Sequence, residues 1–287
     1  MNKKNLNLFL CGSGHGIIAV INGFMNKNQT FQVCTDDAEV IKMCLYNNIP
    51  YVKKLTLLKL NKKDIVIVSS YKPKIAKATL SKARFINIHY ALLPKYRGMH
   101  PIVWSILNGE KYVGYTFHEM THLLDQGPIL YQEKISIKQK TSWELMLDID
   151  KIITKKIFFI VNGILANKYK PRKQIEKNAI YVAPRNYNDC RIIWKEWSVS
   201  FFEKATKALV EPYPLPYFIY KKNIYSILDC EFVTKDYNEI DGRIVYIDDD
   251  YIFVKIPKGI VKIKTISKNN IIIPAIEIFK KIGIRLS

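Results

Sequence analysis

Residues 64–70 read DIVIVSS, an almost unbroken apolar run. A strand with one exposed face alternates apolar and polar residues, whereas a strand covered on both faces is apolar along its length. Such a strand lies inside a parallel sheet with helices on both faces. Strands are also expected at residues 6–10 and 31–34, and helices ending near residue 25 and covering residues 39–47. The sequence therefore predicts an α/β fold with a doubly wound, mostly parallel, Rossmann-like sheet.

The pattern changes in the last third of the chain. A long amphipathic helix at residues 141–165 and a second helix near residues 198–209 are followed by five short strands from residue 217 onward. Short strands separated by turns are typical of a small barrel or an open sheet. We therefore expect a larger α/β domain at residues 1–180. Residues 181–287 should form a smaller domain, in which a linker helix precedes an all-β, OB-like sheet.

A polar cluster suited to chemistry lies between residues 85 and 129. Asn87 and His89 are two apart in an expected strand, so their side chains share one face at its end. Asp125 follows in a loop that a glycine and a proline mark as a tight turn. An amide can polarise a carbonyl group, an imidazole can bind an oxyanion or move a proton, and a carboxylate can orient the imidazole or take a proton. These residue types suit acyl transfer to an amine, and their spacing is equally compatible with ordinary hydrogen bonding.

Four short motifs follow one another in this stretch: Asn87-x-His89, residues 92–98 (LLPKYRG), residues 108–110 (NGE) and residues 124–129 (LDQGPI). In this order and spacing they resemble the folate-dependent formyltransferases. That family includes the methionyl-tRNA, glycinamide ribonucleotide and nucleotide-sugar enzymes. The resemblance implies that Asn87, His89 and Asp125 are the catalytic residues and that 10-formyltetrahydrofolate supplies the formyl group.

The resemblance also implies which residues contact the folate. The pterin ring would be held by the loop that follows residue 70 and by the residue before the catalytic aspartate: Tyr71, Pro73, Ile75 and Leu124. Many family members carry an acidic residue and a glycine ahead of that aspartate, where this chain reads THLL at residues 121–124. The shape of the loop on the folate side is therefore left open.

Four further side chains are candidates for contacts with a nucleotide. Arg97 and Arg185 suit a diphosphate, because a guanidinium group matches the geometry of phosphate oxygens. Tyr181 and Tyr187 could stack on a base. Each of the four is also compatible with a purely structural role.

Residues 118–122 (HEMTH) match the H-E-x-x-H pattern of zinc proteases. That motif binds a metal only on a helix, where positions four apart share a face. Here it follows a β-rich segment and is close to a Gly-Pro turn, which leaves no room for a helix. We therefore expect no metal, and we expect His118 and His122 to be strand and loop residues that line the site.

The chain carries a net charge of +20, which is compatible with an anionic partner. The simpler interpretation, which we favour, is that most of the lysines are solvated on the surface. Residues 1–140 hold 20 basic and 8 acidic residues, whereas residues 181–287 hold 17 and 13. The excess therefore lies in the part of the chain that holds the candidate site, where an anionic folate and a phosphorylated substrate would be drawn. A basic nucleic-acid-binding protein of OB type is the alternative from another class. It leaves the catalytic residues unexplained, and its nearly balanced binding domain does not suit phosphate neutralisation.

Two substrates remain in competition. By resemblance, tRNA enzymes carry a long basic insertion after their second strand, whereas this chain has a short acidic stretch at residues 33–39 (VCTDDAE). Met99-His100-Pro101 also looks like the sugar enzymes, because tRNA enzymes tend to have small residues after Arg-Gly. We therefore expect a nucleotide-linked amino sugar of O-antigen biosynthesis as the substrate, and methionyl-tRNA as the alternative. The sugar, the position of its amine and the nucleotide stay open.

The sequence also bears on where the protein works. No apolar run approaches the roughly eighteen residues that a membrane helix needs, so no membrane association is expected. Glycines at residues 12–16 end the first apolar segment too early for a secretory signal. Five scattered cysteines without paired spacing indicate reduced thiols, and we therefore expect a cytoplasmic enzyme. The oligomeric state stays open, with a homodimer as one arrangement.

Overall fold

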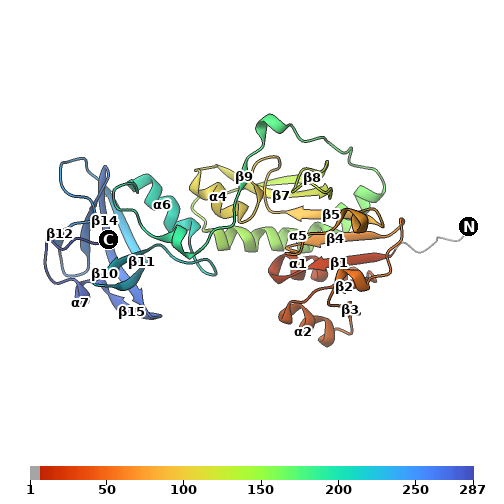
Figure 1. Ribbon diagram of the computed structural model, residues 1–287, viewed down its shortest axis with the longest axis horizontal. Helices are drawn as coiled ribbons and strands as arrows, with labels where there is room; N and C mark the ends of the chain where they lie inside the picture. The colour runs from red at the N-terminus through yellow and green to blue at the C-terminus, as the bar shows by residue number, and fades with distance from the viewer. Residues whose placement is uncertain (1–6) are drawn as a thin grey trace, which may run out of the picture. The chain divides into compact units, whose positions relative to one another are not determined.

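The computed structural model describes residues 7–287. The chain divides into two compact units, and Figure 1 colours the chain by residue number. The N-terminal unit consists of the residues up to Ile102 together with Lys111–Ile137 and Glu144–Ala183. The C-terminal unit consists of Val103–Glu110, Lys138–Trp143 and Pro184–Ser287.

The N-terminal unit is built on one sheet, with seven strands among the described residues in the order β3-β2-β1-β4-β5-β7-β8. Its strands are β1 (Leu8–Gly12), β2 (Gln32–Cys34), β3 (Tyr51–Val52), β4 (Ile65–Ser69), β5 (Arg84–His89), β7 (Tyr112–Glu119) and β8 (Ile129–Ser136). Strands β1 to β5 run parallel, and β7 and β8 are antiparallel to their neighbours. All five residues of β4 are buried. The predicted α/β fold with a mostly parallel sheet is thus confirmed, although residue 6 of the first expected strand lies outside the described residues.

Helices and short turns lie between these strands or follow the last of them. They are α1 (Gly14–Met25), α2 (Ala38–Tyr46), α3 (Lys77–Leu80), α4 (Pro101–Leu107), α5 (Ser142–Leu165) and the 3-10 turns Leu55–Leu57 and Glu176–Asn178. Helix α1 packs directly on α5, because a Cβ atom at Gly23 would lie 2.2 Å from Cγ2 of Ile157. Alternate residues of β1 and β4, such as Phe9 and Val66, pack in a separate apolar cluster with Leu55. No helix in the described part of the chain is both long and apolar enough to cross a membrane.

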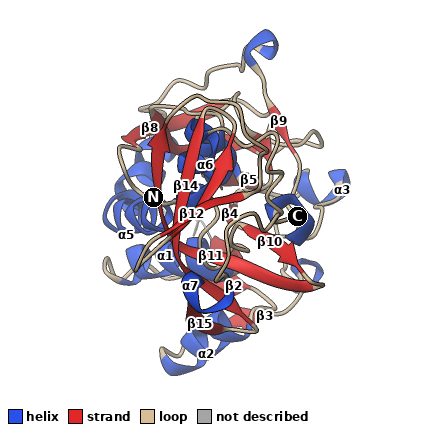
Figure 2. Cartoon of the chain, turned by 90° about the vertical axis from the view of Figure 1, so that its left-hand side faces the viewer, coloured by secondary structure: helices blue, strands red, loops and turns tan. Residues whose placement is uncertain are grey.

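The C-terminal unit holds an antiparallel sheet, whose strands Figure 2 draws in red. The described strands are β10 (Tyr217–Tyr220), β11 (Asn223–Thr234), β12 (Ile244–Ile247), β13 (Ile252–Ile256), β14 (Gly259–Lys268) and β15 (Ile271–Pro274). They are accompanied by the 3-10 turn Tyr187–Cys190, α6 (Val199–Ala208) and α7 (Ala275–Ile278). An aromatic core of Trp194, Phe202 and Phe218 joins the linker segment and α6 to the sheet, with ring centroids about 6 Å apart. The predicted small all-β sheet is confirmed, and β15 is a strand that the sequence did not predict.

Candidate active site

The end of β5 brings two of the expected catalytic side chains together. Asn87 and His89 both lie on β5, two positions apart and therefore on one face. The neighbouring strand β7 runs antiparallel and places His118 directly opposite Asn87. A directly opposed pair has its side chains close together, so the face that carries Asn87 and His89 also carries His118.

Asp125 comes from the loop between β7 and β8. It has a φ of +52°, in the left-handed region that suits a tight turn. Its carboxylate Oδ2 accepts a hydrogen bond of 2.9 Å from the N–H of Gly98, and its carbonyl oxygen accepts one of 2.7 Å from Nε2 of Gln174. The loop also lies against β7, since a Cβ atom at Gly127 would meet the Glu119 carbonyl oxygen at 1.7 Å. These contacts fix the aspartate in one position.

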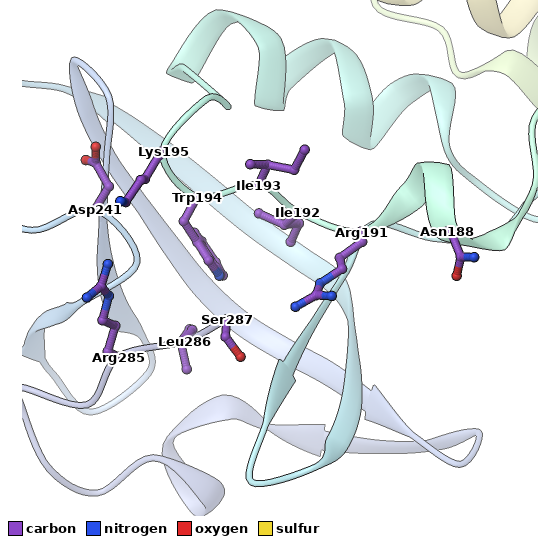
Figure 3. A pocket seen from close by; sticks show the side chains of 10 residues that line it. All are labelled: Asn188, Arg191, Ile192, Ile193, Trp194, Lys195, Asp241, Arg285, Leu286 and Ser287. Carbon is purple, nitrogen blue, oxygen red and sulfur yellow. The ribbon is translucent and has the colours of Figure 1, made fainter.

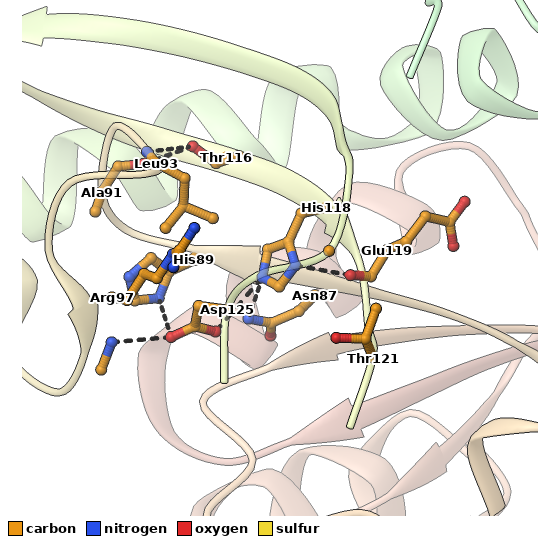
Figure 4. Close-up of polar contacts among 12 residues, drawn as sticks. Asn87, His89, Ala91, Leu93, Arg97, Thr116, His118, Glu119, Thr121 and Asp125 are labelled. Carbon is orange, nitrogen blue, oxygen red and sulfur yellow. Dashed lines mark hydrogen bonds and ion pairs between the residues drawn. The ribbon is translucent and has the colours of Figure 1, made fainter. Parts of the chain in front are cut away.

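The carboxylate of Asp125 lies between two imidazole rings (Figure 4). Oδ2 is 3.8 Å from Nδ1 of His89, and Oδ1 is 3.5 Å from Nε2 of His118. Nε2 of His118 is also 3.1 Å from the amide nitrogen of Asn87. Asn87, His89, His118 and Asp125 therefore form one connected polar cluster, which we call the Asp125 cluster.

Backbone carbonyl groups fix the protons on both rings. Nε2 of His89 lies 2.8 Å from the carbonyl oxygen of Tyr96, and Nδ1 of His118 lies 2.9 Å from that of Glu119. A carbonyl oxygen only accepts, so these two nitrogens donate. In the neutral rings, Nδ1 of His89 and Nε2 of His118 then carry lone pairs. Nε2 of His118 accepts from the amide of Asn87, and Nδ1 of His89 faces Asp125 beyond hydrogen-bond distance.

The electrostatics of the cluster keep His89 and Asp125 in different charge states. The pKa of His89 is lowered, because burial disfavours the imidazolium more than Asp125 favours it. Burial acts to raise the pKa of Asp125, but His89, His118 and the Gly98 N–H together outweigh it, and the pKa falls below the usual value. At neutral pH the cluster thus presents a neutral imidazole beside an ionised carboxylate.

Comparison with known proteins identifies the family. The formyl transferase model matches residues 51–156, and the model of the formyl transferase C-terminal domain matches residues 185–282. A methionyl-tRNA formyltransferase of Clostridium tetani is 30% identical over 242 residues, which are 82% of this chain and 72% of that protein. The chain belongs to the formyl transferase family. It is a folate-dependent enzyme that transfers a formyl group, and 10-formyltetrahydrofolate is the donor.

Solved structures share the fold of this formyltransferase. The sugar 3N-formyltransferase WlaRD, in the presence of dTDP and 5-N-formyl-THF, has a TM-score of 0.71 at 19% identity over 93% of this chain and 98% of that one. The N-formyltransferase of Helicobacter canadensis, in complex with folinic acid and dTDP-3-aminofucose, has a TM-score of 0.70 at 18% identity over 92% and 100%. Likeness at such identities shows that the fold is shared.

Arg97 of the formyltransferase is engaged by internal partners. Its side chain is buried, and its guanidinium group donates to Gln174 at 2.9 and 3.1 Å and to Glu176 at 2.9 Å. It also lies 5.2 Å from the ring centroid of Tyr181. These contacts with an internal carboxylate and amide tie β6 (Arg97–Gly98) to residues 174–181. The expected contact of Arg97 with a diphosphate stays a prediction.

The other expected nucleotide contacts are spread over the chain. Tyr181 is 53% exposed in β9 (Tyr181–Val182), and its hydroxyl donates to Glu176 at 2.9 Å. Arg185 and Tyr187 belong to the C-terminal unit, where Arg185 lies over the ring of Trp104 and Tyr187 stacks on Tyr217. The structure does not bring these last two side chains together with Tyr181 in one unit, and their contact with a nucleotide stays a prediction.

The residues expected around the folate differ in exposure. Ile75 is buried in the apolar cluster of β1 and β4, and Tyr71 and Met120 pack at its margin. Pro73 is exposed, and Leu124 is 62% exposed. A pterin ring is flat and needs both apolar surface and free backbone groups. The exposed side chain of Leu124 and the margin of the cluster fit that need, whereas Ile75 supports the loop from inside.

Sequence reasoning named His118 only as a residue lining the site. The structure shows that it bridges Asn87 and Asp125, whereas His122 is exposed in the following loop. His118 lies in strand β7, so the H-E-x-x-H spacing does not put both rings on one helical face. The signal that could have found its role is the antiparallel register of β5 and β7, which no local pattern specifies.

Proposed function

We propose that this formyltransferase transfers the formyl group of 10-formyltetrahydrofolate to the amino group of a nucleotide-linked amino sugar. The observation that carries the chemistry is the Asp125 cluster, in which a neutral imidazole, an amide and an ionised carboxylate lie together at the end of β5. Parallel α/β sheets bind ligands beyond the carboxyl ends of their strands. We infer that the reaction takes place there.

The amine must lose a proton as its nitrogen bonds to the formyl carbon. Nδ1 of His89 is the better acceptor, because its partner nitrogen already donates to Tyr96 and leaves Nδ1 with a lone pair. Asp125 is a weaker base, since its pKa is held below the usual value, by His89 in the first place. We therefore assign the proton to His89, and we assign Asp125 the stabilisation of the imidazolium that forms.

Asn87 suits the negative charge that develops on the formyl oxygen. An amide carries two N–H donors, and one is engaged by His118. The second N–H is then held in a fixed direction, as an oxyanion donor must be. As the bond between the formyl carbon and the folate nitrogen breaks, His89 returns its proton to that nitrogen, which balances the transfer.

The connection between β2 and α2 supports a sugar nucleotide as the acceptor. It consists of residues 35–37 only, and Asp37 in it accepts hydrogen bonds from the N–H groups of Gly14, Glu39 and Val40. A short connection with two carboxylates offers no basic arm to the phosphates of a tRNA. The two structural neighbours described above were determined with dTDP or a dTDP-amino sugar. We place this step in the cytoplasm, in the supply of amino sugars for O-antigen.

Methionyl-tRNA is the second candidate acceptor, and the sequence relatives favour it. The enzyme of Clostridium tetani and that of a Hydrogenobaculum strain, 33% identical over 210 residues, are both methionyl-tRNA formyltransferases. The two candidates make the same demand on the Asp125 cluster, since both present a neutral amine. They differ in what holds the rest of the acceptor.

A formylation assay separates the two. Purified protein and 10-formyltetrahydrofolate would be offered dTDP-, UDP- and GDP-linked amino sugars and, in parallel, charged initiator methionyl-tRNA, with products detected by mass spectrometry. The proposal expects N-formylated sugar nucleotide and no formylmethionyl-tRNA above the level of a blank. Turnover on the tRNA alone would overturn the choice of the sugar and leave the formyl transfer standing.

A further inference from the structure

The C-terminal unit contains a pocket whose lining shares no residue with the Asp125 cluster. Its volume is about 590 Å³, and its lining includes Arg191, Trp194 and Lys195 of the linker segment together with Asp241, Arg285 and Leu286 (Figure 3). A volume of this order is that of a site for a small organic ligand. All of its lining residues belong to the C-terminal unit, so the pocket is complete within that unit.

The charge of the lining is positive. Arg191, Lys195 and Arg285 contribute three cations, and among the residues that the structure describes no carboxylate lies within ion-pair distance of any of them. Asp241 is the acidic side chain of the lining, and it pairs with the buried Nζ of Lys255 at 3.3 Å. The pocket therefore has a net positive charge that no neighbouring side chain neutralises.

Trp194 supplies the second observation. Its side chain is only 5% exposed, and its indole N–H finds no acceptor among the described residues. Figure 3 shows the indole in the middle of the lining, with Arg191 on one side and Lys195 and Arg285 on the other, and with its nitrogen end toward Leu286. A buried donor without a partner destabilises the fold, so an acceptor supplied by a ligand would recover this loss.

The position of Trp194 is fixed by its surroundings. The ring packs on Phe202 and Phe218, at centroid distances of 6.0 and 5.7 Å. Gly242 lies against its other side with a φ of +83°, and a Cβ atom there would meet Cγ of the indole at 3.0 Å. The unpaired N–H is therefore a rigid feature of the pocket wall and not a rotamer that solvent could turn outward.

We propose that this pocket binds a phosphorylated small molecule of mononucleotide size. The phosphate is held by Arg191, whose guanidinium group matches phosphate oxygens, and accepts a hydrogen bond from the N–H of Trp194. Lys195 and Arg285, on the other side of the indole, add to the positive potential of the pocket. The apolar part of the lining, Ile192, Ile193 and Leu286, contacts a flat organic group.

The test is calorimetric titration of the full chain with UMP, with uridine and with inorganic phosphate. UMP should bind. Uridine and inorganic phosphate should bind at least tenfold more weakly, because uridine lacks the phosphate and inorganic phosphate lacks the flat organic group. Arg191→Gln and Trp194→Phe should each weaken a UMP site at least fivefold. Lys235→Gln, an exposed cation of the same unit outside the pocket, should leave it unchanged.

Two results would overturn the proposal. One is UMP affinity that is the same in Arg191→Gln, Trp194→Phe and the parent chain, and the other is uridine or phosphate binding as tightly as UMP. Arg191 is exposed, so Arg191→Gln leaves the core intact. This variant therefore tests the proposal even if Trp194→Phe fails to fold. Formylation rates of Arg191→Gln should equal those of the parent chain, which separates this site from the proposed function.

Discussion

Asn87 and Asp125 both reach His118, from different elements. His118 contacts both partners, at 3.1 Å from the amide of Asn87 and 3.5 Å from the carboxylate of Asp125. Without it, the amide is free to rotate, and the carboxylate loses one of its contacts. A displacement of about 1 Å in such a group can cost on the order of a hundredfold in rate.

The first prediction concerns His118. His118→Ala should lower kcat by roughly 10- to 100-fold with little change in KM, because it disturbs the orientation of Asn87 and not the binding of either substrate. His122→Ala, at an exposed histidine four residues later, is the matched control and should keep full activity. Steady-state measurements of kcat and KM for the two variants and the parent chain test this prediction. Equal kcat values for His118→Ala and the parent chain would remove His118 from the site.

The second prediction concerns the titration of His89. Burial lowers the pKa of His89 and the charge of Asp125 raises it. Asp125→Asn removes that charge, so the pKa of His89 should fall further and the ring should stay neutral to a lower pH. NMR titration of the imidazole signals, assigned with a His89→Gln variant, measures this. Asp249→Asn, at an exposed carboxylate of the C-terminal unit, should leave the titration unchanged, and an upward shift in Asp125→Asn would contradict the account.

At the scale of elements, the small parallel pair of β6 and β9 holds the carboxylate of Asp125 in place. Gly98, at the end of β6, donates to Asp125, and a Cβ atom there would lie 2.2 Å from the carbonyl oxygen of Val182 in β9. Arg97 anchors the pair through its buried contacts with Gln174. The backbone donor to the carboxylate thus depends on a residue that the sequence assigned to substrate binding.

The third prediction tests that assignment. Arg97→Met should lower the free energy of unfolding by about 2–4 kcal/mol, because it leaves the buried side-chain oxygen of Gln174 without a donor. Glu176→Gln, at the exposed partner of Arg97, should cause a much smaller loss. Urea unfolding measures both. An Arg97→Met variant of full stability whose KM for the sugar nucleotide has risen would instead restore the predicted diphosphate contact.

Local patterns were sufficient for most elements and for half of the site. The apolar run of β4 and the two-residue spacing of Asn87 and His89 follow from strand geometry alone. The meeting of Asp125 with His118 depends on the register of β5 and β7, which is set by tertiary pairing. Strand β15 was missed because it is short and ends in a proline, although the preceding Asn269 and Asn270, both at positive φ, are the residues that a hairpin turn favours.

At the scale of the whole molecule, the dominant feature is the net charge of +20. The buried Arg97 shows why a sequence cannot assign single charges: a cation that serves an internal contact looks the same as one that faces a ligand. The excess of basic residues nevertheless lies in residues 1–140, with 20 against 8. Anionic substrates should therefore approach this part of the chain faster than neutral ones.

The fourth prediction follows from the excess of basic residues in residues 1–140. With the sugar nucleotide as the varied substrate, kcat/KM should fall several-fold between roughly 50 and 500 mM NaCl, because salt screens the attraction between the protein and the phosphates. The value of kcat should change little, since the Asp125 cluster is largely buried. An equal concentration of a neutral osmolyte controls for viscosity and water activity. A salt-independent kcat/KM would show that the excess charge plays no part in substrate capture.

The most direct measurement of the central claim is the formyl-transfer rate, at saturating folate and amino sugar nucleotide, of the parent chain and of the variants Asn87→Ala and His89→Ala. The account predicts losses of at least about a hundredfold in both variants, with circular dichroism spectra unchanged, since each removes a group that acts on the reacting atoms. Either variant retaining the rate of the parent chain would contradict it.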